Sequence, residues 1–165
     1  MDGPLKNLLV VDLTRVLVGP YCTMILSDLG ARVIKVEAPE IGDDSRKFGP
    51  FIKDYSAYFM SLNRGKESIA LNLKNNEEDK KIFDKILSKA DILVENFKPG
   101  TLEKWGFGWK DINKKYPKLI YASASGFGQT GPLKELPAYD MVVQGMGGLM
   151  SVTGQPNSEP TRVGT

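Results

Sequence analysis

The stretch Leu8–Glu37, LLVVDLTRVLVGPYCTMILSDLGARVIKVE, predicts the fold of the chain. Its first part, Leu8–Leu13, is a short apolar run with two valines, typical of a strand buried inside a parallel sheet. A helix that begins near Pro20 follows, and Arg32–Glu37 reads as a second strand. Strand, helix and strand in this order form a βαβ unit. The loop at residues 14–19 then lies at the carboxyl end of the sheet, where open α/β sheets bind ligands.

The remainder of the chain continues to alternate between strand-like and helix-like segments. Strands are predicted at residues 67–73, 91–97 and 119–125, and helices at 56–63, 76–90, 101–105, 109–116 and 139–150, with a long loop at 38–55. Such alternation is typical of an α/β protein with a mostly parallel, Rossmann-like sheet and helices on both faces. We therefore expect this fold class.

The amino-acid composition indicates which kinds of partner and which cellular compartment to expect. Hydrophobic residues make up 41% of the 165 residues and charged residues 25%, with a net charge of +2. These values are ordinary for a globular domain and give no case for nucleic acid. The longest apolar run is too short to span a membrane, and the N-terminus lacks a secretory pattern. Cys22 is the single cysteine, and we expect it in the core. From this cysteine content we expect a cytoplasmic protein.

The sequence contains no histidine. A Ser-His-Asp or Cys-His site therefore cannot be built within these residues, and a zinc site would rest on one cysteine and carboxylates. Asp43-Asp44 allows either a metal site or a solvated loop that caps Arg46, and the loop is the preferred interpretation. We assign no metal, and we expect any chemistry to use carboxylates, lysines, tyrosines or a bound cofactor.

A glycine-rich loop lies within Tyr121–Asp140, YASASGFGQTGPLKELPAYD. Gly126, Gly128 and Gly131 fit the pattern G-x-G-x-x-G, whose free N–H groups can hold an anion. In a dinucleotide-binding fingerprint the glycines lead straight into a helix, whereas Pro132 follows here. A dinucleotide-binding module and an ordinary surface loop both remain open.

Three segments are predicted at the carboxyl ends of parallel strands: Thr14–Pro20, Glu95–Gly100 and the glycine-rich loop. Nearby cations are Arg64, Lys66, Lys74, Lys98 and Lys104. Backbone donors, cations and aromatic side chains at one edge of a sheet suit a nucleotide-like ligand with phosphates.

The motifs, taken in order, resemble family III CoA-transferases. They are DLTRVLVGPYCTMILSDLGARVIKVE (Asp12–Glu37), GDDSR (Gly42–Arg46), SLNRGKESIALNLK (Ser61–Lys74), DILVENFKPGTLEKWGFGW (Asp91–Trp109) and SGFGQTGP (Ser125–Pro132). Formyl-CoA transferase, carnitine CoA-transferase and the succinate–hydroxymethylglutarate enzyme belong to this family. The resemblance covers nearly the whole chain.

The resemblance implies an enzyme that moves CoA between short-chain carboxylic acids through an aspartyl-CoA thioester. Residues 1–165 would form the N-terminal part of its large, CoA-binding domain, and the small domain and the C-terminal return would lie outside them. The partners would be acyl-CoA, a small carboxylic acid and a second subunit in an interlocked homodimer. CoA would be a substrate, and no cofactor would be bound covalently. The nucleophilic aspartate is expected past Thr165, so no catalytic residue is assigned and these residues alone are expected to be inactive.

The resemblance also implies which residues contact CoA. They are Leu17, Val18, Leu71, Asn72, Leu73, Lys74, Asn96, Phe97, Lys98, Lys104, Tyr139 and Asp140. Phe97 is favoured for the adenine end, and Asp140 would order the site, cap the following helix, or both. Family members usually carry an arginine that meets a CoA phosphate at the position of Ala38. The alternatives are a non-catalytic CoA-binding fragment or subunit and a generic dinucleotide-binding module.

Overall fold

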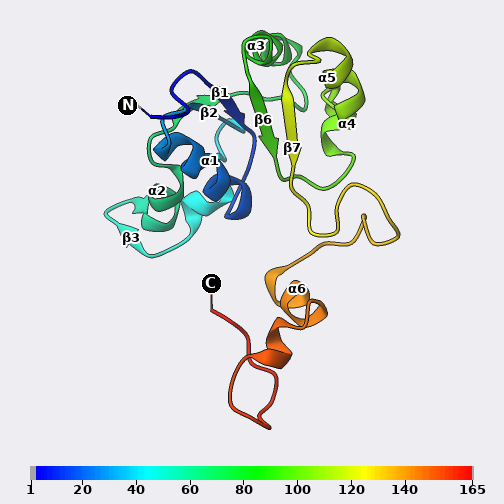
Figure 1. Cartoon of the computed structure of the whole chain (residues 1–165). Helices are drawn as coiled ribbons and strands as arrows, with labels where there is room; N and C mark the ends of the chain where they lie inside the picture. The colour runs from blue at the N-terminus through cyan, green and yellow to red at the C-terminus, as the bar shows by residue number, and fades with distance from the viewer. Residues whose placement is uncertain (1–2, 165) are drawn as a thin grey trace. The chain divides into compact units, whose positions relative to one another are not determined.

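The computed structural model describes residues 3–164, and the chain divides into two compact units, Met1–Ala124 and Ser125–Thr165. Within the described residues, the first unit contains a five-stranded parallel sheet in the order β5-β2-β1-β6-β7 (Figure 1). The strands are β1 (Leu9–Asp12), β2 (Arg32–Glu37), β5 (Glu67–Ala70), β6 (Ile92–Glu95) and β7 (Ile120–Ser123). The sheet confirms the α/β prediction.

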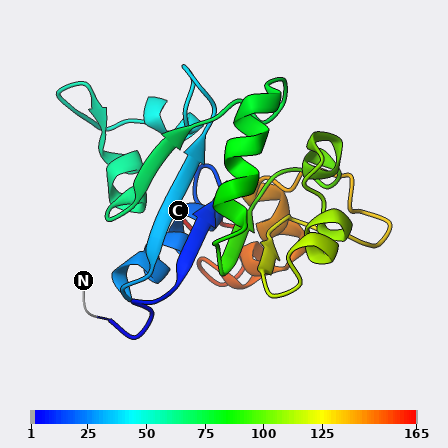
Figure 2. The same cartoon turned by 90° about the horizontal axis from the view of Figure 1, so that it is seen from above.

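Helices cover both faces of this sheet. They are α1 (Val18–Asp28), α2 (Ala57–Asn63), α3 (Glu77–Leu87), α4 (Thr101–Trp105) and α5 (Trp109–Lys115). On one face Leu26 of α1 packs against a buried cluster that contains Val10 and Val33. On the other face Phe83 of α3 and Ile112 of α5 belong to the larger buried cluster. Figure 2 shows helix α3, in green, against the strands.

The apolar composition of β1 follows from this double coverage. Val10 and Val11 are both fully buried although consecutive side chains point to opposite faces of a strand. Val10 joins the cluster beneath α1, whereas Val11 joins the cluster beneath α3. A central parallel strand therefore needs a continuous apolar run, and this requirement made the strand recognisable in the sequence.

The element boundaries differ from the predictions in three places. The segment 38–55, predicted as a loop, contains a 3₁₀ helix η1 (Asp44–Lys47) and the short hairpin β3 (Phe51–Ile52) with β4 (Tyr55–Ser56). Strand β5 ends at Ala70, although the predicted strand ran to residue 73, whereas Pro20 lies in the first turn of α1, as predicted. In the second unit, the predicted helix 139–150 is α6 (Asp140–Met146) followed by η2 (Leu149–Val152).

Two further features concern single residues. Cys22 is exposed, so the expectation that it belongs to the core was wrong. It lies on the outer side of α1, where Tyr21 and Ile25 are also exposed. The sequence offers Asn75 or Asn76 as the N-cap of α3, and the structure assigns the position to Asn76, whose side chain accepts hydrogen bonds from the N–H groups of Glu78 and Asp79.

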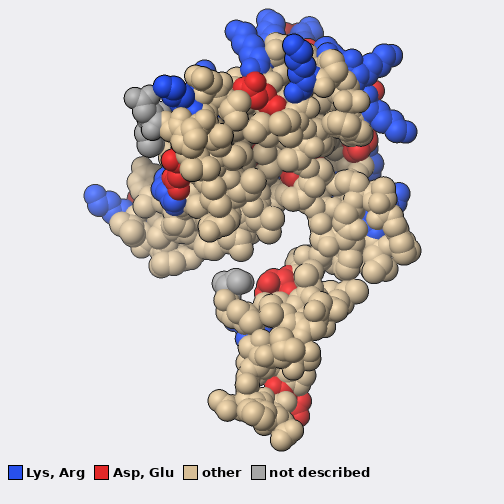
Figure 3. Space-filling view, viewed as in Figure 1, with Lys and Arg blue, Asp and Glu red and all other residues tan. Residues whose placement is uncertain are grey.

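Lysines gather over α3 and α5 in the view of Figure 3. Three of the lysines on these helices are paired: Lys80 with Glu77, Lys81 with Glu78 and Lys115 with Asp84. No helix within residues 3–164 is both long enough and apolar enough to cross a membrane.

A buried carboxyl group joins the ends of β6 and β7. Glu95 is 5% exposed, its Oε2 atom accepts a hydrogen bond of 2.8 Å from the N–H of Phe97, and its Oε1 atom accepts one from Ser123 Oγ. Burial raises the pKa of Glu95, an effect that the hydrogen bonds from Ser123 and Phe97 only partly offset and to which Glu103 adds. The charged form is therefore disfavoured in the folded protein.

We predict that Phe83→Ala destabilises the protein by roughly 3–5 kcal/mol, because it leaves a cavity in the core. Phe83 is fully buried and its ring packs edge-on against that of Phe107, with 4.8 Å between centroids. Urea denaturation of wild type and variant measures the loss. The neighbouring Ile82, 42% exposed on the same helix, provides the control: Ile82→Ala should cost about 1 kcal/mol or less. Equal losses for both variants would contradict the packing described here.

We predict that Glu95→Gln stabilises the protein relative to wild type by an amount that grows as the pH rises. The folded-state pKa of Glu95 lies above the unfolded value, so the folded state is penalised once the group must ionise. This penalty is absent below the unfolded pKa of about 4.3 and is complete above the folded pKa. Glutamine can still accept from Phe97 N–H and donate to Ser123.

Unfolding free energies measured between about pH 4 and pH 7 test this prediction, since the interval begins near the unfolded pKa. Glu78→Gln, at an exposed carboxylate on α3, controls for the general loss of a negative charge. Parallel pH profiles for wild type and Glu95→Gln would refute the prediction.

Candidate functional site

A cavity of about 610 Å³ opens at the carboxyl ends of β1, β2, β5 and β6. Its size is typical of a pocket for a small molecule or cofactor. It is lined by Leu13, Thr14, Arg15, Val36, Glu37, Ala38, Pro39, Glu40, Ile41, Gly42, Asp43, Leu71, Asn72, Leu73, Lys74, Phe97, Lys98, Thr101 and Trp105. All of these residues belong to the first unit, so one compact body forms the whole cavity.

The cavity lies at the point where the chain reverses direction across the sheet. From β1 the chain proceeds outward to β2 and β5, and it then returns to place β6 on the other side of β1. Arg15 follows β1 and Asn96 follows β6. The Asn96 side chain accepts from Arg15 N–H and donates to Arg15 C=O, both at 2.8 Å. This bridge joins the two loops at the switch point, where ligands of open α/β sheets bind.

Cations and aromatic rings meet at the edge of the cavity. The Arg15 guanidinium lies 5.1 Å from the centre of the Phe97 ring and 3.2 Å from a carboxylate oxygen of Asp44. The Phe97 ring packs edge-on against Trp105, with 5.2 Å between centroids. Lys74 and Lys98 line the cavity and are exposed. A planar group and an anionic group could therefore bind side by side.

Residues 38–43 form one wall of the cavity, and Glu37 fixes this wall from below. Glu37 accepts hydrogen bonds from Asp43 N–H at 3.0 Å, from Ser68 at 2.7 Å and from two nitrogens of Arg46 at 2.7 Å. Burial opposes ionisation of Glu37, but the Arg46, Ser68 and Asp43 contacts outweigh it and hold the pKa of this carboxyl below its ordinary value. Glu37 therefore holds the loop that forms this wall in place.

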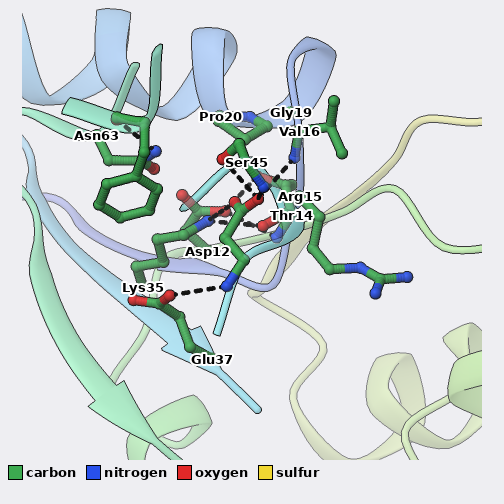
Figure 4. A network of polar contacts seen from close by, with 12 residues as sticks. Asp12, Thr14, Arg15, Val16, Gly19, Pro20, Lys35, Glu37, Ser45 and Asn63 are labelled. Atoms are coloured by element: carbon green, nitrogen blue, oxygen red, sulfur yellow. Dashed lines mark hydrogen bonds and ion pairs between the residues drawn. The ribbon is translucent and has the colours of Figure 1, made fainter. Parts of the chain in front are cut away.

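Two lysines, Lys35 and Lys66, are buried with carboxylate partners close to the residues that line the cavity. Lys66 Nζ lies 3.0 Å from Asp12 Oδ2 and donates to Asn63 and to Pro20 C=O. Burial lowers the pKa of Lys66, an effect that Asp12 partly offsets. Asp12 also accepts from Thr14 N–H at 2.8 Å (Figure 4).

The second pair is Lys35 with Asp43, whose side chains are 2% and 0% exposed. Lys35 Nζ lies 2.9 Å from Asp43 Oδ2. It also donates to Thr14 C=O at 2.7 Å, and both of these residues are labelled in Figure 4. Asp43 Oδ1 accepts from Val16 N–H and from Ser45. Burial opposes the charged form of Asp43, yet Lys35 and Ser45 keep the pKa of this carboxyl below its usual value.

The structure brings together part of the predicted binding set. Leu71, Asn72, Leu73, Lys74, Phe97 and Lys98 all line the cavity. Asn96 stands behind it and holds Arg15. Leu17 and Val18 do not line it, since they begin helix α1, and Val18 is 66% exposed. Lys104 is exposed on α4, also outside the cavity lining.

The other predicted residues lie in the second unit. Tyr139 is 73% exposed, and Asp140 is the first residue of α6. The N-cap interpretation of Asp140 was wrong, because Tyr139 holds that position and Asp140 instead accepts from Gln144 at 2.8 Å. The glycine-rich loop does not lead directly into a helix, since α6 begins only at Asp140. This arrangement does not match a dinucleotide fingerprint.

Some of the predicted cations have structural partners instead. Arg64 pairs with Asp28 at 2.5 Å, and Lys66 is buried against Asp12. The preferred interpretation of Asp43-Asp44 was also wrong, because Asp43 is buried and Arg46 is bound by Glu37. Within residues 3–164, no group of three or more His, Cys, Asp or Glu side chains could hold a metal ion.

Sequence reasoning did not single out Lys35, and it named Ala38 and Asp43 without placing them, or Arg15, around one cavity. For Lys35 a signal was present, because a lysine inside an otherwise apolar strand of a sheet covered on both faces requires a buried partner. For Arg15 the sequence placed its segment at the site but gave no indication of its contact with Phe97. The wall at residues 38–43 depends on hydrogen bonds to Glu37, and no local sequence pattern predicts these hydrogen bonds.

Solved structures with the same fold belong to larger proteins. A CAIB/BAIF family protein from Brucella suis superposes with a TM-score of 0.93 at 44% sequence identity, covering 100% of this chain and 44% of that one. The hypothetical protein Rv3272 from Mycobacterium tuberculosis gives a TM-score of 0.85 at 37% identity, covering 97% of this chain and 43% of that one.

Curated relatives give the same assignment. An acetyl-CoA:oxalate CoA-transferase from Acetobacter aceti is 57% identical over 162 residues, 98% of this chain and 41% of the relative. The human succinyl-CoA:glutarate CoA-transferase is 47% identical over 162 residues, 98% of this chain and 37% of the relative. The chain thus spans about 40% of the length of such relatives. Residues 5–165 match the profile described as CoA-transferase family III, and the chain belongs to this family.

Proposed function

We propose that the protein containing this chain transfers CoA between short-chain carboxylic acids, and that residues 1–165 supply the N-terminal part of its CoA-binding domain. The observation that carries this proposal is the cavity at the switch point, which combines exposed cations, an aromatic pair and apolar side chains. Membership of CoA-transferase family III supports the same reaction class.

The cavity suits the chemical parts of CoA. Phe97 and Arg15 offer flat surfaces for an adenine ring, and Lys74 and Lys98 offer charges for phosphates. Leu71 and Leu73 line the cavity from below and suit an apolar chain. The predicted contacts of Leu17, Val18, Asn96, Lys104, Tyr139 and Asp140 with CoA remain part of the proposal.

Ala38 lines the cavity at the position where the family resemblance implies an arginine. We propose that Arg15 compensates for that missing cation. Arg15 lines the same cavity, and its guanidinium is half exposed. Its pairing with Asp44 is exposed as well, so a doubly charged phosphate can compete for it.

The proposed chemistry needs a carboxylate nucleophile and no histidine, since a carboxylate is ionised at neutral pH. An aspartate oxygen attacks the thioester carbonyl of acyl-CoA, forms a mixed anhydride and releases CoA thiolate. The thiolate attacks the aspartyl carbonyl, which yields an aspartyl-CoA thioester and the free acid. The acceptor acid reverses these steps. We propose that this aspartate lies beyond Thr165 and that the protein acts as an interlocked homodimer.

The names of the relatives indicate the size of the acids. Oxalate and glutarate are named as substrates of relatives that share 57% and 47% identity with this chain. We propose acids of this short-chain class for the present protein. A non-catalytic CoA-binding protein is the alternative, and the transfer experiment below distinguishes it from an enzyme.

We predict that the full-length protein binds CoA and does not bind NAD, and that Lys74→Ala and Lys98→Ala each weaken CoA binding. Loss of one charge-assisted contact to a phosphate should cost roughly 5–30-fold in Kd, about 1–2 kcal/mol. Isothermal titration calorimetry measures these affinities.

The matched control is Lys81→Ala, at an exposed lysine of α3 that lies outside the cavity lining. It should leave the CoA affinity unchanged. Binding of NAD in place of CoA would favour the dinucleotide-binding module. Equal effects of all three lysine substitutions would mean that CoA binds through nonspecific attraction to a basic surface rather than in the cavity.

We also predict that the full-length protein exchanges CoA between succinyl-CoA or acetyl-CoA and oxalate or glutarate. Chromatography of the CoA esters detects the product, and hydroxylamine should convert an enzyme-bound aspartyl thioester to a hydroxamate that mass spectrometry locates. A protein that binds CoA but forms neither product nor hydroxamate would be the non-catalytic binder.

A further inference from the structure

The turn Thr14–Val16, which follows β1, is held in an unfavourable backbone conformation. Val16 has φ of 68°, in the left-handed region that a β-branched residue rarely adopts. Such a conformation persists only where surrounding contacts impose it. Thr14 and Arg15 line the cavity, so the geometry of this turn determines where the Arg15 side chain enters it.

The buried pair of Lys35 and Asp43 holds both ends of this turn. Lys35 Nζ donates to Thr14 C=O at 2.7 Å, and Asp43 Oδ1 accepts from Val16 N–H at 3.1 Å. Between these contacts, Asn96 binds the N–H and C=O groups of Arg15. The backbone of three successive residues is therefore fixed by side chains from β2, from the cavity wall and from the end of β6.

The same pair also connects the turn to the wall of the cavity. Asp43 caps η1 by accepting from Ser45 N–H at 2.9 Å, and its own N–H donates to Glu37. Asp43 is thus part of the cavity wall and also one of the residues that hold the turn. Its second oxygen, Oδ2, forms an ion pair with Lys35 Nζ at 2.9 Å and accepts no hydrogen bond from the described residues, so the charge of Lys35 is the contact that compensates it.

A need for stability does not explain why these charges are buried. Two apolar side chains of similar volume often stabilise a core as well as a buried ion pair does. Apolar side chains cannot, however, donate to the carbonyl at one end of the turn and accept from the N–H at its other end. The specific contribution of the pair is therefore the placement of the backbone.

We propose that Lys35 and Asp43 form a positioning pair that prepares the Thr14–Val16 turn, and with it Arg15 above Phe97, for the ligand of the cavity. This inference rests on the proposed function, with CoA as the ligand. Neither residue needs to touch the reacting atoms, and the pair acts through the turn.

The experiment compares Lys35→Met, Asp43→Asn and the double variant in the full-length protein. Each single variant leaves one buried group without its charged partner, so stability should fall and the Kd for CoA should rise roughly 10-fold or more. In the double variant no unpaired charge remains, so stability should recover substantially. The affinity should stay low, because Thr14 C=O still lacks its donor.

Two measurements separate positioning from a general loss of structure. Hydrogen–deuterium exchange of the peptide that contains Thr14–Val16 should be faster without ligand in Lys35→Met and in the double variant. Phe83→Ala, at a fully buried core residue that does not line the cavity, provides the control: it should lower stability by a comparable amount while the Kd for CoA changes far less. If Lys35→Met does not fold, the same measurements are made on the double variant, which buries no uncompensated charge.

Affinity that recovers together with stability in the double variant would overturn the inference, as would unchanged exchange at the turn. An affinity loss in Phe83→Ala as large as in Lys35→Met would do the same. A wild-type protein that binds no CoA would instead overturn the proposed function, and the exchange data would then show only whether the pair holds the turn. If the wild type binds CoA and the double variant binds it with equal affinity, the positioning role is rejected and the proposed function is not.

Discussion

Two lysine ammonium groups are buried beneath the carboxyl ends of β1 and β2, and the remainder of the site depends on how their charges are matched. A buried ion without a partner is too costly for a folded protein, so each lysine requires a carboxylate in reach. Asp12 at the end of β1 and Asp43 at the end of the cavity wall meet this requirement. Because Asp12 also binds Thr14, and Asp43 also binds Val16, charge pairing and loop geometry are satisfied by the same atoms.

This arrangement explains how residues far apart in the sequence form one cavity. The order of the strands places β6 next to β1, which brings Asn96 beside Arg15. Polar side chains then replace the backbone partners that a loop between a strand and a helix lacks. The cavity is therefore built on the rigid end of the sheet, whereas its exposed cations, Lys74 and Lys98, remain free to move toward a ligand.

The sequence was informative where one physical rule controls a segment. Apolar runs such as Leu8–Leu13 predicted the buried strands, and Asn76 predicted the start of α3 through its capping bonds. The rule was insufficient where distant partners decide the outcome. Lys66 resembles a surface cation in a turn, yet Asp12 binds it in the interior, and Cys22 resembles a core residue, yet it faces outward. The predicted binding set placed Phe97 and Lys98 in the cavity, but Arg15 and the wall at residues 38–43 emerged only from the three-dimensional contacts.

The ion pair of Lys35 and Asp43 also constrains which amino-acid substitutions this chain can accept. A change at position 35 alone strands a buried carboxylate, and a change at position 43 alone strands a buried ammonium group, so either single step is penalised. The two positions are coupled, and the path from one compatible pair to another passes through a less stable intermediate. We therefore expect substitutions at positions 35 and 43 to occur together, whereas the exposed lysine of α3 at position 81 can be exchanged alone.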